Sequence, residues 1–170
     1  FWSDHPFERE FKGIQKFEAI SRSHEGLVDI LQIGGTEEYF YYVMELADAV
    51  GGSGFLDLGS GGAPDAKSES QDPRGYEPRT LRSDLYHRGR LPFDECLQIG
   101  LALATALDHL HRHGLVHRDI KPSNIIFVNG IPKLADIGLV ARAEATLSLV
   151  GTEGYLPPEG PGTAQADIYS

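Results

Sequence analysis

Residues 117–124 read His-Arg-Asp-Ile-Lys-Pro-Ser-Asn, and residues 136–138 read Asp-Ile-Gly. Together the two segments supply carboxylates at Asp119 and Asp136, an amide at Asn124 and an ammonium at Lys121. Phosphoryl transfer passes through a transition state whose negative charge is spread over oxygens, so catalysis depends on positioning and on supplied positive charge. The spacing of these side chains therefore indicates phosphoryl transfer to a hydroxyl group.

Each of the four side chains suits one role in that reaction. Asp136 offers a hard carboxylate oxygen to Mg²⁺, and Asn124 offers an amide oxygen that coordinates the ion without adding charge. Asp119 is expected to accept the proton of the hydroxyl, and Lys121 to place a mobile point charge beside the transferring group. The sequence thus predicts Asp119 and Lys121 as catalytic residues, with Asn124 and Asp136 as metal ligands.

A short hairpin is expected to bring the two metal ligands together. The apolar stretches 125–128 and 133–135 flank Asn129-Gly130, and Asn-Gly is typical of a tight two-residue turn between strands. Antiparallel pairing of the two stretches returns Asp136 to the side of Asn124.

The same residues resemble the catalytic core of a eukaryotic-type (Hanks-type) serine/threonine protein kinase. The pattern H-R-D-L-x-x-x-N followed by D-F-G is matched, with Ile120 for the usual Leu and Ile137 for the usual Phe. In the family that aromatic residue packs under helix C and helps to set the active or inactive state. Ile137 therefore departs from the family at this switch, while the metal ligand beside it is kept.

Further segments follow in the order expected of that family. Residues 151–155 and 157–159 resemble the end of an activation segment, and residues 167–170 resemble the start of the central helix of the large lobe. Upstream, residues 41–47 resemble the last strand of the small lobe running into the hinge. The resemblance covers nearly the whole chain except residues 50–75, and a bacterial source is expected.

The resemblance implies an ATP site at this hinge. Met44 takes the gatekeeper position. The backbone expected to hydrogen-bond adenine is that of Glu45, Leu46 and Ala47. The cofactors that the resemblance implies are ATP and Mg²⁺.

Helix C is expected around residues 7–11. Glu10 is the expected partner of the ATP-binding lysine, and Glu8 is the competing choice. No glycine-rich loop of the form G-x-G-x-x-G and no V-A-I-K strand precede Phe1. The sequence therefore reads as a kinase-domain fragment cut at both ends, which is not expected to bind ATP well or to be active alone.

Arg118 and three hydroxyl residues form the expected regulatory set. Arg118 can pair with a phosphorylated residue of the activation segment through charge-assisted hydrogen bonds, or it can simply pair with a nearby carboxylate. By resemblance, Thr152 contacts the catalytic Asp and Lys and helps to admit serine or threonine substrates. This leaves Thr146 and Ser148 as the expected phosphosites.

The implied fold is α+β: a two-lobed, protein-kinase-like fold with a partial small lobe and the first part of a mainly helical large lobe. Residues 1–47 are expected to form the small-lobe remainder and hinge. Residues 48–78 form a Gly/Ser-rich insert and linker. Residues 79–170 form the large-lobe part with the catalytic loop and activation segment.

Hydrophobic spacing locates the individual elements. Helices are expected over residues 4–19, 79–88 and 93–112, the last with an apolar stripe from Cys96 to Leu110. Strands are expected over residues 27–33 and 38–44, paired antiparallel through a turn at Gly34-Gly35. Residues 51–75 have the composition of a flexible linker, because no helix start or Lys-Ser/Thr follows their glycines to make a phosphate-binding loop.

The histidines near the end of the third helix raise a metal hypothesis. His109 and His113 lie one turn apart, with His111 between them. No motif such as H-E-x-x-H accompanies them, so structural roles are favoured. His117 is likewise expected to pack and hydrogen-bond rather than to carry protons.

Composition narrows the class of partner and the compartment. The chain has 170 residues, 41% of them hydrophobic, which is enough for one sizeable core. Its formal net charge of −10 argues against binding to nucleic acid or to an anionic membrane. The single cysteine, Cys96, cannot form an internal disulfide and is expected to pack as a small apolar residue.

No apolar run approaches the roughly 20 residues that span a bilayer. A cytoplasmic domain with no membrane contact of its own is therefore expected. Bacterial kinases of this type often carry a membrane span elsewhere in the chain, so the parent protein can still be membrane-anchored.

Three functions remain open at this point. The first is transfer of the γ-phosphate of Mg-ATP to Ser or Thr hydroxyls of protein substrates, favoured by Lys121 and Thr152. The second is a pseudokinase or ATP-binding scaffold, which only the missing glycine loop and lysine support. The third is a small-molecule phosphotransferase of the aminoglycoside or choline type, a class that generally lacks Lys121 and the segment Pro157-Pro158-Glu159.

Overall fold

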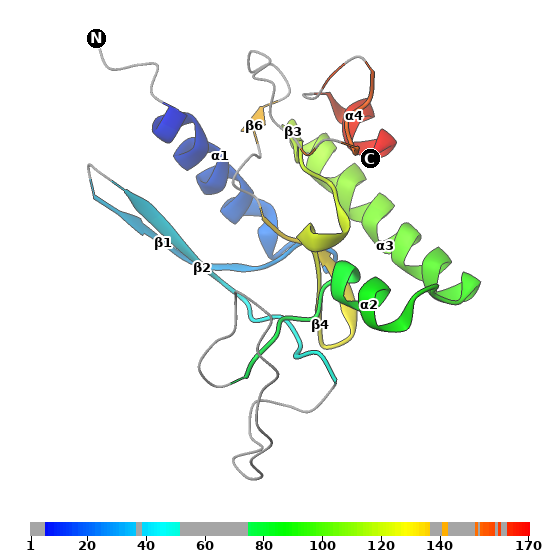
Figure 1. Cartoon of the computed structure of the whole chain (residues 1–170). Helices are drawn as coiled ribbons and strands as arrows, with labels where there is room; N and C mark the ends of the chain where they lie inside the picture. Colours follow the sequence, from blue (N-terminus) through cyan, green and yellow to red (C-terminus); the bar gives the residue numbers. More distant parts are fainter. Residues whose placement is uncertain are drawn as a thin grey trace.

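Short helices and two-stranded sheets alternate along the chain in a mixed α+β arrangement (Figure 1). This computed structural model describes residues 6–36, 39–51, 75–136, 141–142, 152, 154–158, 160 and 163–170, without the side chains of residues 6–10 and 141–142. The elements, in chain order, are α1 (Pro6–Ser21), β1 (Ile30–Gly35), β2 (Phe40–Met44), α2 (Leu81–Arg88), α3 (Phe93–Arg112), β3 (Leu115–Val116), η1 (Pro122–Asn124), β4 (Ile125–Val128), β5 (Ile131–Leu134), β6 (Ala141–Arg142) and α4 (Ala164–Tyr169).

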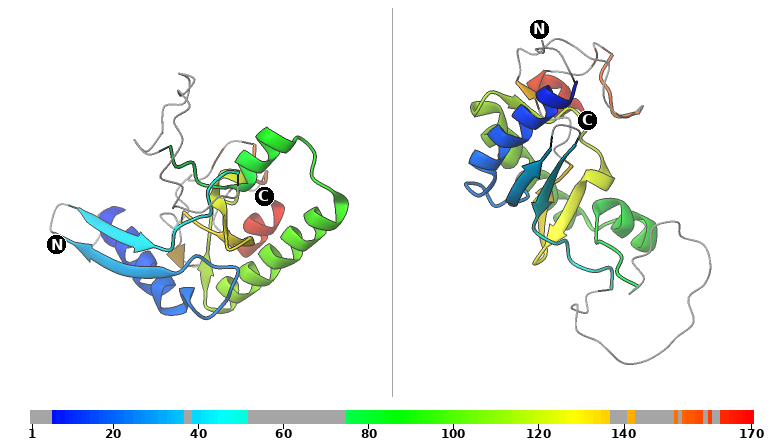
Figure 2. Two further views of the ribbon diagram at one scale, coloured as in Figure 1. Left: turned by 90° about the horizontal axis from the view of Figure 1, so that it is seen from below. Right: turned by 90° about the vertical axis from the view of Figure 1, so that its left-hand side faces the viewer.

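Helix α1 lies along the β1–β2 ribbon (Figures 1 and 2). Its inward positions Ile14 and Phe17 are fully buried, and the ring of Phe11 lies 5.7 Å from that of Phe40 on β2. The helix predicted for residues 4–19 is therefore confirmed, with its bounds moved to Pro6–Ser21.

The antiparallel pairing of β1 with β2 is confirmed, but the predicted turn at Gly34-Gly35 is wrong. Both glycines are paired within β1, opposite Tyr41 and Phe40. A Cβ atom at Gly34 would lie 2.5 Å from the end of the exposed Tyr41 ring, so the glycine lets this ring lie close over the strand. The ribbon instead reverses beyond the glycines, where Thr36 N–H donates to the Tyr39 carbonyl at 2.7 Å.

Helix α3 has the bounds predicted from its periodicity. Its buried residues are Ile99, Ala106, Leu107 and Leu110, and the last three belong to the main core. Cys96 is exposed, so its expected packing as a small apolar residue is wrong. The reason is that the first turn of α3 extends beyond the core, where Phe93 is also 78% exposed.

Helix α2 begins two residues later than predicted because Thr80 caps it. The Thr80 side chain accepts from the Ser83 N–H, and the Ser83 hydroxyl accepts from the Thr80 N–H. This reciprocal pair satisfies two backbone donors that a helix start leaves open.

The predicted hairpin is present as β4 and β5, with Ile125 opposite Leu134 and Val128 opposite Ile131. Asn129 and Gly130 both have positive φ, at 52° and 77°, as a tight turn matched to the strand twist requires. One core joins this hairpin to α1, β1 and α3. Its fully buried members include Phe17, Leu27, Leu110 and Leu134.

The remaining short elements are β3, β6 and α4. β3 pairs with β6, a pairing that the sequence did not indicate, and α4 lies near the end of α3 (Figure 1). Among the described helices, none combines the length and apolarity that a bilayer crossing needs. The lobe boundaries near residues 47 and 79 stay predictions, and residues 52–74 of the expected linker lie outside the described residues.

Candidate active site

The segment between β3 and η1 is held by one carboxylate from α4. Asp167 is 3% exposed and accepts the backbone N–H of His117 at 2.8 Å and that of Arg118 at 2.7 Å. It also accepts from Nε2 of His111 on α3 at 2.8 Å. Arg118 has a left-handed backbone, with φ of 73°, which costs energy for a residue with a side chain. Asp167 thus fixes the loop in a conformation that it would not adopt alone.

His117 is fully buried beneath this loop. Its Nε2 donates to the Ala135 carbonyl at 3.0 Å, and its Nδ1 accepts the Asp119 N–H at 3.4 Å. These partners require the neutral imidazole. Burial lowers the pKa of His117, although nearby Asp167 acts in the opposite direction. The predicted packing and hydrogen-bonding role of His117 is confirmed.

Folding stability is expected to fall as the pH drops below about 6.5, the ordinary pKa of histidine. In the folded chain the pKa of His117 lies below that value. At a pH between the folded and the unfolded pKa, the unfolded chain therefore binds more protons than the folded chain. The slope reaches up to about 1.4 kcal/mol per pH unit for one such group. Urea unfolding of the full-length protein at pH 7.5 and 5.5 measures it.

His117→Gln is expected to flatten this dependence, whatever it does to stability at pH 7.5. The exposed His87→Gln should leave the dependence as in the wild type and serves as the control. Equal slopes for His117→Gln and wild type would contradict the assignment. The carboxyl of Asp84, whose pKa the Arg79 hydrogen bond lowers, affects stability only in a more acidic range.

Asp119 lies at the centre of a ring of hydrogen-bond donors. Lys121 Nζ lies 2.7 Å from Oδ2, and the Thr152 hydroxyl donates to Oδ1 at 2.7 Å. Lys121 also donates to the Thr152 hydroxyl at 2.9 Å, and Asn124 Nδ2 donates to Oδ2 at 2.9 Å. The contacts of Thr152 with both side chains agree with what the resemblance implies.

The ring keeps Asp119 ionised. Its carboxyl is 7% exposed, and burial alone raises its pKa. The hydrogen bonds from Lys121, Thr152 and Asn124 outweigh burial, so the pKa of Asp119 lies below its ordinary value. A buried anion with an adjacent ammonium is therefore present at neutral pH.

The two expected metal ligands both lie at the open end of the β4–β5 hairpin, opposite its turn. Asn124 precedes β4 and Asp136 follows β5, and the Ala135 N–H donates to the Asn124 carbonyl at 2.8 Å. The Asn124 amide nitrogen is engaged by Asp119, and its Oδ1 accepts the Ser123 hydroxyl at 3.3 Å. The amide oxygen is thus the atom suited to a cation.

Asp136 has a left-handed backbone with φ of 56°. Its carboxylate lies near enough to Tyr42 on β2 to raise the pKa of that phenol, together with burial, which contributes more. Within the described residues no three His, Cys, Asp or Glu side chains are grouped as a metal site. A pair of oxygen ligands completed by substrate phosphates is the pattern that Mg²⁺ commonly uses, so these residues fit the ion.

The three histidines near the end of α3, which raised the metal hypothesis, make hydrogen bonds within the structure. His111 bonds to Asp167, His109 to the Ser23 hydroxyl, and His113 Nδ1 to the His109 carbonyl. These structural contacts are what the sequence favoured over a metal site.

The expected hinge follows β2. Met44 ends that strand and is 37% exposed, and Leu46 is 61% exposed. The Glu45 N–H donates to the Asp29 carbonyl at 3.0 Å, and the Ala47 carbonyl accepts from the Tyr76 hydroxyl at 2.8 Å. Among the described residues, the Glu45 carbonyl and the Ala47 N–H have no hydrogen-bond partner. Those two groups are therefore available to a ligand.

Several expected residues cannot be placed in the site. Glu10 and its competitor Glu8 lie on α1 without described side chains. Thr146, Ser148 and Ile137 lie outside the described residues. Arg118 is 9% exposed, and burial lowers the pKa of its guanidinium. Its pairing with a phosphorylated residue stays a prediction.

Two charged residues at the site escaped the sequence reasoning. Asp167 was assigned only to the start of a helix, although it holds the catalytic loop. Lys133 is 8% exposed on β5 and pairs with the Glu45 carboxylate. A lysine set among apolar residues of a strand is the signal that could have revealed this pair, because a lysine is rarely buried without a partner.

The mixed α+β fold and the hydrogen-bonded ring around Asp119 agree with a protein kinase domain. The protein kinase domain family matches residues 74–170, and the chain belongs to this family.

Similar proteins are serine/threonine kinases of bacteria. The serine/threonine-protein kinase PrkC of Bacillus subtilis is 28% identical over an alignment of 178 positions, covering 99% of this chain and 23% of that protein. A probable serine/threonine-protein kinase PknB of Lactococcus lactis is 28% identical over 174 positions, covering 96% and 22%. PknA of Corynebacterium glutamicum is 43% identical over 99 positions, covering 52% and 21%. The chain spans about a fifth of the length of these relatives.

Proposed function

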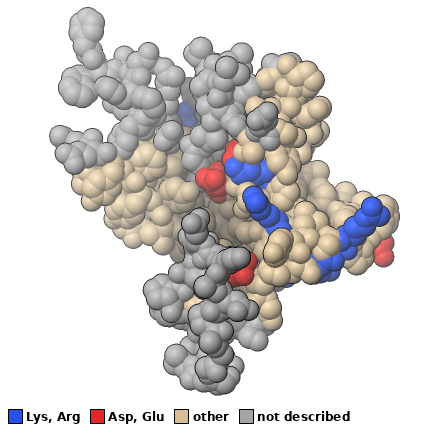
Figure 3. Space-filling view, in the orientation of Figure 1, with Lys and Arg blue, Asp and Glu red and all other residues tan. Residues whose placement is uncertain are grey.

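We propose that the full-length protein transfers the γ-phosphate of Mg-ATP to Ser or Thr hydroxyls of protein substrates. The observation that carries this proposal is the ring formed by Asp119, Lys121 and Thr152, which holds an ionised carboxylate beside an ammonium. Acidic and basic side chains lie together near the middle of the face in Figure 3. Such a pair suits a reaction in which a hydroxyl must lose a proton while phosphate charge is stabilised.

In the proposed mechanism each residue of the chain has one task. The Asp119 carboxylate would orient the substrate hydroxyl and take its proton as the new phosphate–oxygen bond forms and the bond from the γ-phosphorus to the β,γ-bridging oxygen breaks, which releases ADP. The Lys121 ammonium lies where the transferring phosphoryl group carries its charge. Asn124 and Asp136 provide the oxygens that hold Mg²⁺, which when bound neutralises the charge of the phosphates.

The nucleotide is proposed to bind at the hinge. The Glu45 carbonyl can accept from the adenine amino group, and the Ala47 N–H can donate to a ring nitrogen. Met44 is proposed to serve as the gatekeeper residue behind this position. Glu10 is proposed to pair with the ATP-binding lysine of the full-length protein.

Specificity for aliphatic hydroxyls and autophosphorylation are tested in one experiment. Full-length protein incubated with γ-labelled Mg-ATP and a generic protein substrate is expected to give phosphoserine or phosphothreonine on acid hydrolysis, since Thr152 and Lys121 line the proposed hydroxyl site. Mass spectrometry of the same sample is expected to place phosphate on Thr146 or Ser148, where Arg118 can pair with it.

Phosphotyrosine as the main product would overturn the specificity. Nucleotide binding without transfer would indicate a pseudokinase, and label found only on an aminoglycoside or choline would indicate a small-molecule phosphotransferase. Absence of phosphate at both activation-segment residues would contradict the regulatory part alone.

A further inference from the structure

Three distant backbone segments meet at the outer edge of β4. The Asp48 N–H donates to the Phe127 carbonyl at 2.7 Å, and the Phe127 N–H donates to the Arg79 carbonyl at 3.0 Å. The Arg79 N–H closes the ring on the Asp48 carbonyl at 2.6 Å. The chain leaving the hinge and the chain entering α2 are thereby both fixed to the hairpin.

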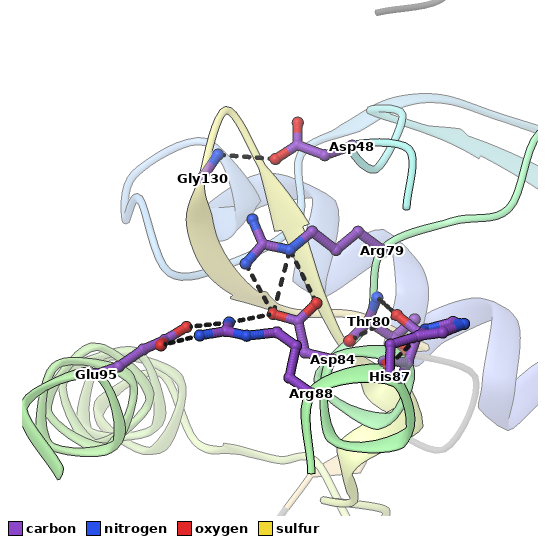
Figure 4. A network of polar contacts seen from close by, with 9 residues as sticks. Asp48, Arg79, Thr80, Asp84, His87, Arg88, Glu95 and Gly130 are labelled. Atoms are coloured by element: carbon purple, nitrogen blue, oxygen red, sulfur yellow. Dashed lines mark hydrogen bonds and ion pairs between the residues drawn. The ribbon is translucent and has the colours of Figure 1, made fainter. Parts of the chain in front are cut away.

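The Asp48 side chain grips the turn of the same hairpin. Its Oδ1 accepts the Asn129 N–H at 2.8 Å. Its Oδ2 accepts the Gly130 N–H, also at 2.8 Å (Figure 4). Both turn residues have positive φ, a conformation that asparagine tolerates better than most residues with a Cβ but that still gains from a bonded N–H. A carboxylate bonded to both N–H groups favours this turn over the alternatives.

The Arg79 side chain lies over Phe127 on β4 of the hairpin. Its guanidinium lies 4.2 Å from the centre of the Phe127 ring. Asp84 on α2 binds it in a bidentate manner, at 3.1 Å from Nε and 2.7 Å from Nη2. Arg88 joins Asp84 to Glu95 on α3 (Figure 4). Arg79 therefore ties the hairpin to two helices.

The opposite end of this hairpin carries both expected metal ligands. Asn124 and Asp136 flank its strands, and the Ala135 N–H bond to the Asn124 carbonyl keeps the strand ends together. A small rotation of so short a hairpin about its turn displaces its far end. Residues that fix the turn and the outer strand therefore act on the ligands at a distance.

We infer that Asp48 and Arg79 form a hairpin clamp that positions the metal ligands Asn124 and Asp136. The two residues are positioning residues, since neither touches the metal or the substrate. The inference rests on the proposed function for the identity of the ligands. Its direct consequence is that the Mg²⁺ concentration needed for nucleotide binding depends on the Asp48 carboxylate, which lies at the turn of the hairpin.

The test compares Asp48→Asn with Asp108→Asn in the full-length protein. The control substitution makes the same chemical change on the exposed face of α3. The Asp108 carboxylate there is 56% exposed and pairs with Arg112. Asp48→Asn keeps one acceptor for the turn but points an amide donor at the other N–H. Two quantities are measured: Mg²⁺-dependent binding of a fluorescent ATP analogue, and amide hydrogen exchange of peptides covering residues 124–136.

The Mg²⁺ concentration for half-maximal binding is expected to rise about tenfold in Asp48→Asn, in the range seen when residues behind metal ligands are changed. Exchange in residues 124–136 should speed up with it, and Asp108→Asn should show neither change. A lower thermal midpoint with an unchanged Mg²⁺ requirement would overturn the inference, because a purely structural role gives that result.

Arg79→Lys provides a second test of the inference if Asp48→Asn does not fold. Lysine retains the charge beside Asp84 but loses the bidentate contact and the stacking on Phe127, and the same rise in Mg²⁺ requirement is expected. An unchanged requirement in folded Arg79→Lys would overturn the inference. Failure of wild-type protein to transfer phosphate would contradict the proposed function alone, since the binding and exchange measurements need no turnover.

Discussion

Replacing Asp119 by asparagine in the full-length protein is expected to lower phosphate transfer by about three orders of magnitude, within the usual range for loss of a catalytic base. An amide cannot take the proton of the substrate hydroxyl. Its NH₂ group would also face Lys121 or Asn124, which are donors themselves. The measurement is the initial rate of labelled phosphate incorporation at saturating Mg-ATP.

The matched control for this variant is Asp108→Asn, which removes an exposed carboxylate far from the ring and should retain wild-type turnover. Asp119→Asn is expected to unfold at a lower temperature than the wild type, because its NH₂ group faces a donor, so turnover is compared at a temperature where both proteins are folded. A variant that is folded and turns over near the wild-type rate would remove Asp119 from the proposed mechanism.

Asp167→Ala is expected to destabilise the domain by about 4 kcal/mol. The change leaves three donors without an acceptor, namely the N–H groups of His117 and Arg118 and Nε2 of His111. Each buried donor left unsatisfied costs about 1–3 kcal/mol. Since domains are stable by only about 5–15 kcal/mol, urea unfolding should show a large loss.

Asp167→Asn should fall between Ala and the wild type, because one oxygen remains to accept a backbone N–H. A loss below about 1 kcal/mol in Asp167→Ala would show that water or a rearranged loop satisfies these donors, contrary to the structure.

Local sequence signals predicted the parts of the fold that local forces determine. The Asn129-Gly130 turn and the bounds of α3 follow from residue types within a few positions, and both are present. The ring around Asp119 was expected from family resemblance, and Lys121 and Thr152 do contact that carboxylate.

Features set by tertiary packing were missed. Gly34 was assigned to a turn because the sequence does not show the Tyr41 ring that lies over it. Cys96 fits the apolar stripe of α3, yet nothing local reveals that the core stops short of it. Asp167 bonds to His117 across 50 positions, a contact that no periodicity encodes.

Backbone pairing beside the hairpin clamp limits how far a change of length in residues 51–75 can affect the active site. The Val50 N–H donates to the Glu77 carbonyl at 2.9 Å, and Ala49 pairs with Pro78, so the chain on either side of residues 51–75 is joined before it reaches the hairpin. Closing a longer loop costs only about 0.6 kcal/mol for each doubling of its length. A change in the number of residues between these two points is therefore expected to leave the hairpin and the proposed metal ligands in place.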